Sequence, residues 1–348
     1  MKAPNFARAG IMALIVVVIS ILCWESYLRH KGVTADYDDG GPLWSDKRAR
    51  VYEASDQATV FVGDSRIKFD VDIPTWESIT GEDAIQLGMV GSSPRPVLEN
   101  LANDPNFKGK VIIDVTEPIF FSSSPFFFED PNENISFYKK ETPSQKFGFQ
   151  IDRILESGFV FLDKENFSTN AMLDELHIPN RSTVPTMPIF PWQFGRVTFK
   201  RQSYMTPSFL ADTSLQNRVK AIWGLYGRML AAPAPTGDTL QTLLNSVKAA
   251  TDKIKARGGQ VVFLRPPSSE PVLSAETRGF PREKYWDRIL SFTQCPGIHF
   301  KDYPAIDHFV CPESSHLSSR DAVSFTRELI SILEKEQKWS FTKKTAAL

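Results

Sequence analysis

Residues 58–66 read Ala-Thr-Val-Phe-Val-Gly-Asp-Ser-Arg, a β-branched and aromatic run that ends abruptly in Gly-Asp-Ser. An uninterrupted apolar run is typical of a strand that is covered on both faces of a parallel sheet. Gly63 permits the sharp turn that follows. Ser65 is therefore expected at the carboxyl end of a strand, where open α/β sheets bind their ligands. The alternative is an ordinary turn, since Gly, Asp and Ser are common turn residues.

Further apolar runs follow the first one and alternate with stretches of helical periodicity. Leu240, Leu243, Leu244, Val247 and Ile254, for example, recur at helical spacing between Asp238 and Arg257. Strands and helices that alternate in this way predict an α/β domain with a doubly wound parallel sheet. Later strands are expected at the start of 85–94, over 111–117 before Pro118, over 260–267 and over 298–303. Helices are expected near 94–103, 238–257 and from Ser318 onward.

The chain of 348 residues is long enough for one large domain with an insertion, and we expect that domain over 58–334. The insertion spans about 119–240, where clustered phenylalanines and a Pro-rich stretch interrupt the alternation. It could form a lid, a substrate platform or an irregular excursion, and the platform is favoured because long ordered loops are often functional. A polar lead-in (28–57) precedes the domain and a polar tail (335–348) follows it. The net charge of −1 gives no basic field and so no nucleic-acid partner.

Residues 9–24 carry no charge, and the apolar run extends to Tyr27 if Glu25 lies among lipid headgroups. Since about 17–20 residues suffice to cross a bilayer, residues 9–27 are predicted to be a transmembrane anchor. Lys2 and Arg8 precede the run, which favours a cytoplasmic N-terminus over residues 1–8. A cleaved signal peptide is the alternative, although no small-x-small cleavage site follows the run. In either case the bulk of the chain lies beyond the membrane.

Glu313 and His316 lie three residues apart in a loop before the last helix. A carboxylate in that position can accept a hydrogen bond from one ring nitrogen and leave the other free to act as a base. The alternative is a packing or capping histidine, because the nearby serines and Asp321 resemble a helix N-terminus. His308 is a weaker candidate base: Asp307 is its direct neighbour, and adjacent side chains of an extended loop point apart.

Taken together, Gly63-Asp64-Ser65, the Gly88-Met-Val-Gly91 loop and Glu313-x-x-His316-Leu resemble the SGNH, or GDSL, hydrolase family. The resemblance covers roughly 58–118 and 238–334 and leaves the insertion outside. It implies a flavodoxin-like fold with Ser65 as nucleophile and His316 as general base. Glu313 stands where the family usually has aspartate. The backbone N–H groups of Ser65 and Gly91 would form the oxyanion hole.

The chain departs from the family in its third block, where Gly-x-Asn-Asp is expected and Asp114-Val-Thr-Glu117 is found. Thr116 takes the place of the asparagine that donates to the oxyanion, and loss of one such donor can cost about 10²–10³ in rate. Arg66 and Arg265 are candidates for binding an anionic group of the substrate. Each could instead be a surface arginine or part of a structural ion pair.

Cys295 and Cys311 could form a disulfide bridge outside the cytoplasm, or remain two free thiols. No Cys/His cluster has metal-ligand spacing and no Gly-rich phosphate loop is present, so neither a metal nor another cofactor is expected.

The resemblance and the anchor together imply a serine O-acyltransferase or esterase tethered to the inner (cytoplasmic) membrane with its bulk in the periplasm. The substrate would be a cell-envelope polysaccharide or an acylated compound, and a membrane acyl-transfer partner could supply the acyl group. Departure from the third-block motif leaves an alternative: a catalytically inactive scaffold or glycan-binding subunit of an envelope polysaccharide assembly.

Overall fold

The computed structural model describes residues 6–52, 58–174, 176, 188–230 and 232–342. The chain divides into two compact units. Unit 1 comprises Met1–Asp38 and Phe147–Ile189, and unit 2 comprises Asp39–Lys146 and Phe190–Leu348. The predicted insertion is therefore shared between the units: its middle part belongs with the N-terminal helix and its two ends belong with the α/β body.

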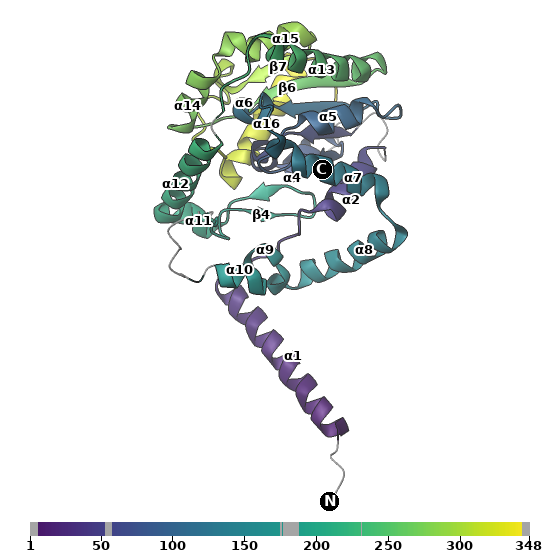
Figure 1. Cartoon of the computed structure of the whole chain (residues 1–348), viewed down its shortest axis with the longest axis vertical. Helices are drawn as coiled ribbons and strands as arrows, with labels where there is room; N and C mark the ends of the chain where they lie inside the picture. The colour runs from purple at the N-terminus through teal and green to yellow at the C-terminus, as the bar shows by residue number, and fades with distance from the viewer. Residues whose placement is uncertain (1–5, 53–57, 175, 177–187, 231, 343–348) are drawn as a thin grey trace, which may run out of the picture. The chain divides into compact units, whose positions relative to one another are not determined.

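Unit 2 is built on a five-stranded parallel sheet with strand order β2-β1-β3-β6-β7 (Figure 1). The prediction of an α/β domain around a parallel sheet is confirmed, and every expected strand lies within a few residues of its predicted place. The strands are β1 (Thr59–Val62), β2 (Ala84–Gln86), β3 (Lys110–Asp114), β6 (Gln260–Arg265) and β7 (Gly297–His299).

Helices surround this sheet, and a two-stranded antiparallel ribbon of β4 (Arg196–Val197) and β5 (Ser203–Tyr204) accompanies it. The helices of the first half are α2 (Gly41–Ala49), α3 (Ser65–Asp70), α4 (Ile73–Thr80), α5 (Arg95–Ala102), α6 (Glu117–Phe120) and α7 (Glu129–Lys140). Those of the second half are α11 (Pro207–Ala211), α12 (Thr213–Met229), α13 (Gly237–Ala256), α14 (Val272–Gly279), α15 (Trp286–Thr293) and α16 (Ser319–Lys335).

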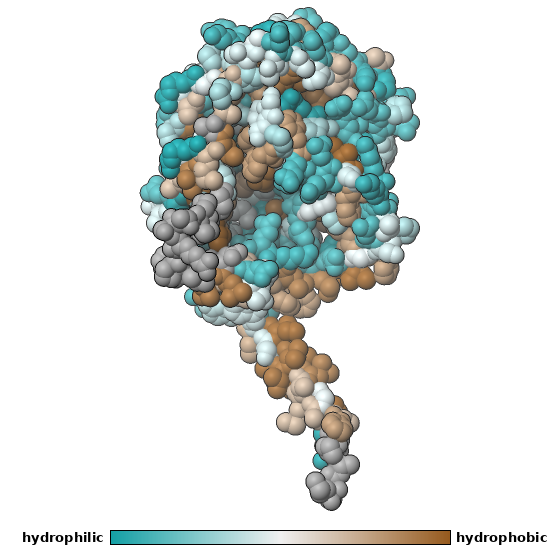
Figure 2. Space-filling view, in the orientation of Figure 1, coloured by the Kyte–Doolittle hydropathy of each residue, from teal (hydrophilic) through white to brown (hydrophobic). Residues whose placement is uncertain are grey.

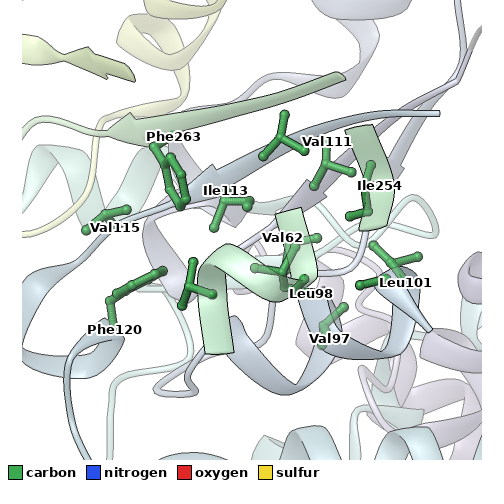
Figure 3. Close-up of a cluster of buried hydrophobic side chains, with 14 of the residues drawn as sticks. Val62, Val97, Leu98, Leu101, Val111, Ile113, Val115, Phe120, Ile254 and Phe263 are labelled. Carbon is green, nitrogen blue, oxygen red and sulfur yellow. The ribbon is translucent and has the colours of Figure 1, made fainter. Parts of the chain in front are cut away.

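Each central strand contributes to two separate apolar cores because successive side chains point to opposite faces of a sheet. Val60 and Val62 of β1 lie in the core with α5, α13 and α15, whereas Phe61 lies in the core with α4 and α16. The same alternation holds along β3 and β6. Figure 3 shows part of the first core, which contains Val62 together with Leu98 of α5 and Ile254 of α13.

The two buried cysteines lie in different cores. Cys295 packs with the first core and Cys311 with the second, and both are free thiols. Of the two alternatives left open for these cysteines, the structure has the free thiols and no disulfide. Nearness in sequence suggested a bridge, but the chain passes the edge of the sheet between the two positions.

Part of the tail predicted to be polar is packed against unit 2. Trp339 is buried in the second core and Phe341 packs against it. Lys110 Nζ donates to the carbonyl of Ser340 at 2.9 Å, and the Thr342 N–H donates to Glu82 Oε1 at 3.1 Å. Residues 336–342 therefore continue the folded body; residues 343–348 lie outside the described part.

Unit 1 contains the N-terminal helix α1 (Phe6–His30), which is long and apolar enough to cross a membrane. Its other elements are α8 (Pro143–Gly158), which begins in unit 2, the short helix η3 (Val160–Leu162), α9 (Lys164–Phe167) and α10 (Thr169–Asp174). The orientation of α1 in a membrane, with residues 1–8 in the cytoplasm, stays a prediction.

Candidate active site

Ser65 is the first residue of α3, directly after the turn that ends β1. The Asp64 side chain accepts a hydrogen bond from the Arg66 N–H at 2.8 Å and so caps the N-terminus of α3. Gly63 is required in this turn, since a Cβ there would lie 2.4 Å from the Cβ of Asp114. The Gly-Asp-Ser sequence thus does both things considered for it: it forms a turn, and it presents a serine at the carboxyl end of a strand.

His316 connects the two ends of the predicted triad. Its Nε2 lies 2.8 Å from Ser65 Oγ, and its Nδ1 lies 2.7 Å from Glu313 Oε1. Glu313 Oε1 also accepts the backbone N–H of His316 at 2.7 Å, which holds the carboxylate in place. With Nδ1–H donating to Glu313, Nε2 is the free base that accepts from the serine hydroxyl. Glu313 and His316 are both fully buried, and Ser65 retains slight exposure.

The loop that carries Glu313 and His316 is fixed at a residue in the left-handed region, Ser314, whose φ is +81°. Ser314 Oγ donates to the carbonyl of Glu270 at 2.9 Å. Next along the chain, Ser318 caps α16 by accepting the Asp321 N–H at 3.1 Å. The capping function that was an alternative for this segment is therefore performed by Ser318, and His316 remains available to Ser65.

Aromatic side chains enclose the imidazole of His316. Ring centroids of Phe69, Phe194 and Trp223 lie 4.6, 5.7 and 5.8 Å from that of His316. The indole Nε1–H of Trp223 also donates to Glu313 Oε2. Both carboxylate oxygens of the triad acid are therefore occupied.

Two of these aromatic residues come from the predicted insertion, and sequence reasoning did not associate them with the site. Trp223 lies on α12 and Phe194 lies in the segment before β4. The only signal in the sequence was the abundance of aromatic residues in this region. The end of the insertion thus contributes directly to the surroundings of the candidate base.

The two backbone N–H groups that were predicted to form the oxyanion hole are both unpaired among the described residues. Within the described part of the chain, neither the Ser65 N–H nor the Gly91 N–H has a hydrogen-bond acceptor. Gly91 lies in the loop after β2 with φ +61°, a conformation that favours glycine. The Thr116 hydroxyl makes only a long contact, 3.5 Å, with Asp114 Oδ1. Thr116 is thus directed toward a carboxylate, which weakens it as a replacement for the family's asparagine.

A buried carboxyl group supports the turn before Ser65. The Asp64 N–H donates to Asp114 Oδ2 at 3.2 Å. Burial, followed by the charge of neighbouring Asp64, raises the pKa of Asp114 well above its usual range. The close approach of Asp114 to Gly63 and Asp64 fixes the strand-to-helix turn that positions Ser65.

A second buried carboxyl group, Asp70 at the end of α3, supports the other side of the site. Its Oδ1 accepts the Leu317 N–H at 2.8 Å, which ties α3 to the residue after His316. Burial raises the pKa of Asp70 to about 7, against the opposing charges of His316 and Arg66. Its other oxygen, Oδ2, has no hydrogen-bond partner among the described residues. An ionised Asp70 is therefore costly near neutral pH.

Arg66 and Arg265 are buried and lie in one ion-pair network, which is the structural alternative considered for them. Both donate to Glu276, and Arg265 Nε donates to Glu117 Oε1 at 3.0 Å. Burial works to raise the pKa of Glu276, but the two guanidinium groups outweigh it and hold that pKa at about 2. Ser268 Oγ also donates to Glu276, at 2.8 Å. Two cations thus face two carboxylates, which gives both arginines a structural ion-pair role. Arg66 Nη1 has no hydrogen-bond partner among the described residues.

The remaining candidates take no part in the triad. His308 is exposed, and its Nδ1 lies 3.3 Å from the carbonyl of Pro304. Burial, with Asp70 and Glu313 nearby, raises the pKa of the Cys311 thiol well above its usual range, so this thiol is not a nucleophile. Among the residues that the structure describes, no group of three or more His, Cys, Asp and Glu side chains could hold a metal ion.

No protein-family model matches the chain, and no curated protein matches it.

The geometry of the site suits acyl transfer through a serine. A hydroxyl is hydrogen-bonded to an imidazole, the imidazole is oriented by a buried carboxylate, and free N–H donors lie on the serine and in the neighbouring loop.

Proposed function

We propose that this chain is a membrane-anchored SGNH-like serine O-acyltransferase or esterase that acts outside the cytoplasm on a cell-envelope polysaccharide. The observation that carries the proposal is the continuous chain of contacts from Ser65 through His316 to Glu313, with distances of 2.8 and 2.7 Å. The strand order β2-β1-β3-β6-β7 also fits a flavodoxin-like sheet, in which the sequence order is 2-1-3-4-5.

In the first half of the reaction, Ser65 Oγ attacks the carbonyl carbon of an acyl ester while His316 Nε2 takes the hydroxyl proton. Negative charge develops on the carbonyl oxygen, where the N–H groups of Ser65 and Gly91 can donate to it. The leaving alcohol takes the proton from His316, and the acyl group remains on Ser65. Glu313 stabilises the imidazolium that forms in between.

In the second half, His316 removes a proton from an incoming hydroxyl, whose oxygen attacks the acyl carbon. The bond to Ser65 Oγ then breaks, and His316 Nε2 returns the proton to that oxygen, which restores the serine hydroxyl. A sugar hydroxyl gives O-acylation and water gives hydrolysis. The apolar helix α1 supports placement in a membrane. We place that membrane at the inner face of the envelope, with the body in the periplasm, because the N-terminal Lys2 and Arg8 favour a cytoplasmic N-terminus. An acyl-transfer partner in the membrane would supply the acyl group, and the chemistry requires no cofactor.

The test is labelling of the full-length protein in detergent with a fluorophosphonate probe, which reacts with activated serines. We expect labelling of the unmodified chain, its loss in Ser65→Ala and strong reduction in His316→Ala. Ser246→Ala is the matched control, because that serine lies on α13 and its hydroxyl donates to the carbonyl of Leu243.

A second measurement separates transfer from hydrolysis: release of p-nitrophenol from p-nitrophenyl acetate, with and without a soluble oligosaccharide acceptor. Acetate appearing on the oligosaccharide supports transfer, and free acetate alone supports an esterase. The long Thr116–Asp114 contact favours one alternative, an inactive scaffold or glycan-binding subunit. Absence of labelling in folded protein, with retained oligosaccharide binding, would support that alternative.

A further inference from the structure

The exposed side of α8 is apolar. Phe147, Ile151, Ile154 and Leu155, here called the α8 stripe, recur at i, i+4, i+7 and i+8 and are 69, 46, 64 and 41% exposed. On the opposite side of the helix, Glu156 is buried. A surface helix of a water-soluble protein turns its apolar side to the core and its charges outward. Helix α8 buries Phe149 and Glu156 but leaves the four stripe residues exposed, so much of its apolar surface is not covered by the protein.

More exposed apolar side chains follow in the same unit. Phe159 comes directly after α8, and three further residues lie in or just after α10. Figure 2 shows brown and tan side chains gathered along α8. The members of this second group are Met172, Leu173 and Leu176, which are 41, 52 and 58% exposed.

The end of α8 is joined to the end of α1 by hydrogen bonds. Glu25 of α1 accepts the N–H groups of Val160 and Phe161 at 3.1 and 3.2 Å, and Arg29 Nη2 donates to the carbonyl of Gly158 at 2.9 Å. Arg29 also pairs with Glu25 at 2.6 Å. Glu25 is where the uncharged run of α1 ends, so α8 is attached at the level where a spanning α1 would leave the hydrocarbon layer.

Helix α8 runs across the end of α1 in Figure 1 and does not continue along it. A helix in that direction lies along a membrane surface when α1 crosses the membrane. The stripe from Phe147 to Leu155 is about 12 Å long, at about 1.5 Å per residue. Its four side chains would therefore enter the layer between lipid headgroups and acyl chains together.

The charges of α8 identify the kind of lipid contact. The helix carries two cations, Lys146 and Arg153, and two anions, Asp152 and Glu156, so it has no net charge. Attraction to anionic lipid would need an excess of lysine and arginine. Any affinity for a bilayer must come from the apolar stripe and be insensitive to headgroup charge.

We propose that the α8 stripe, with the exposed apolar residues of the 159–176 segment, inserts into the interfacial layer of the bilayer that α1 spans. This inference rests on the proposed membrane anchor. It gives unit 1 a second attachment to the lipid, which holds α8 flat on the membrane instead of leaving unit 1 free on its tether.

The experiment uses full-length protein in nanodiscs of neutral phosphatidylcholine, with an environment-sensitive NBD fluorophore attached to single cysteines. Native Cys23, which is exposed on α1, reports the span itself. In a Cys23→Ser background, Ile154→Cys reports the stripe and Asp252→Cys, on α13 of unit 2, is the matched control. Cys295 and Cys311 are buried and stay unlabelled in folded protein.

We expect the label at position 154 to emit at shorter wavelength and to be quenched by doxyl-labelled phosphatidylcholine, as the label at Cys23 is, while the label at 252 stays accessible to aqueous iodide. The same result is expected with anionic phosphatidylglycerol added. Adding Ile151→Gln and Leu155→Gln to the labelled protein should abolish quenching at 154 without changing the far-UV circular dichroism.

Iodide access at 154 together with lipid quenching at Cys23 would overturn the inference and leave the anchor intact. Access at both positions would overturn the anchor as well. Cross-linking between copies through position 154, without lipid quenching, would identify a second copy of the chain as the occupant of the stripe. Fluorophosphonate labelling of Ser65 in the same nanodiscs tests the proposed chemistry independently.

Discussion

Replacing Glu276 by glutamine removes the negative charge that two buried guanidinium groups share. Arg66 and Arg265 both donate to this carboxylate. Without its charge, Arg265 keeps Glu117 as an ion-pair partner, and only the nearby carboxyl groups of Asp64 and Asp114 still act on Arg66. Removing one partner of a buried ion pair costs about 3–5 kcal/mol, because a charge is left uncompensated in a medium of low polarity. Glu276→Gln should therefore be among the most destabilising polar substitutions in unit 2.

The pKa of Glu276 gives a second value for the free energy that this ion-pair network contributes. The network lowers this pKa from 4.5 to about 2, and at about 1.4 kcal/mol per pH unit the native network contributes about 3 kcal/mol at neutral pH. Because the native pKa is depressed, that contribution is present above pH 4.5 and is lost as the pH falls toward 2. The two free energies agree in size.

The assay is urea unfolding of the full-length protein in detergent, followed by tryptophan fluorescence at several pH values. Glu276→Gln should lower the free energy of unfolding by about 3 kcal/mol at pH 7, and the difference from the unmodified protein should shrink below pH 4.5. The control is Asp302→Asn, which breaks an exposed pair with Arg282 and should cost less than about 1 kcal/mol. Unchanged stability of Glu276→Gln, combined with weaker substrate binding, would refute this reasoning and return Arg66 and Arg265 to the role of anion binders.

Three further predictions concern residues around the triad and the cysteines. Trp223→Phe should slow fluorophosphonate labelling about tenfold, because it removes the indole hydrogen bond to the Glu313 carboxylate. Such a bond to a charged group is worth about 1.5–3 kcal/mol, and part of that energy stabilises the transition state. Asp70→Asn should raise the free energy of unfolding at pH 7 and above. Because the native pKa of Asp70 is raised to about 7, the unmodified protein loses up to about 4 kcal/mol of stability as the pH rises from 3.8 to about 7. Urea unfolding across that pH range should show this loss with aspartate at position 70 and not with asparagine. Thiol titration of protein unfolded without reductant should find three thiols, because Cys295 and Cys311 are not bridged.

Matched controls make these outcomes decisive. Trp24→Phe on α1 should leave labelling unchanged, so equal rates for both tryptophan variants would remove Trp223 from the site. Asp307→Asn, at an exposed position, should leave the pH dependence of stability intact. A count of one thiol in the unfolded protein would show a bridge and contradict the described cores.

The sequence predicted the helices and strands because the residue pattern that specifies each one lies within its own residues. The apolar run before Gly63 has the composition of a buried strand, and the helical spacing after Asp238 gave α13. The same holds for the site residues that share a turn: Glu313 reaches His316 across three residues, and Ser65 follows its strand directly. The uncharged run of α1 was likewise readable from length and composition.

Only the tertiary structure decided which distant groups meet. Trp223 lies 90 residues before Glu313, and Arg66 lies 210 residues before Glu276, separations over which no periodicity or spacing carries information. The sequence left open whether the two arginines bind a ligand or form ion pairs, and whether the two cysteines are bridged. The structure decided both questions by placing Glu276 beside the arginines and the cysteines in different cores. The pattern of apolar and polar residues along a chain specifies its strands and helices. Which charged groups are paired, and which side chains are enclosed, depends instead on how those elements pack together in the complete fold.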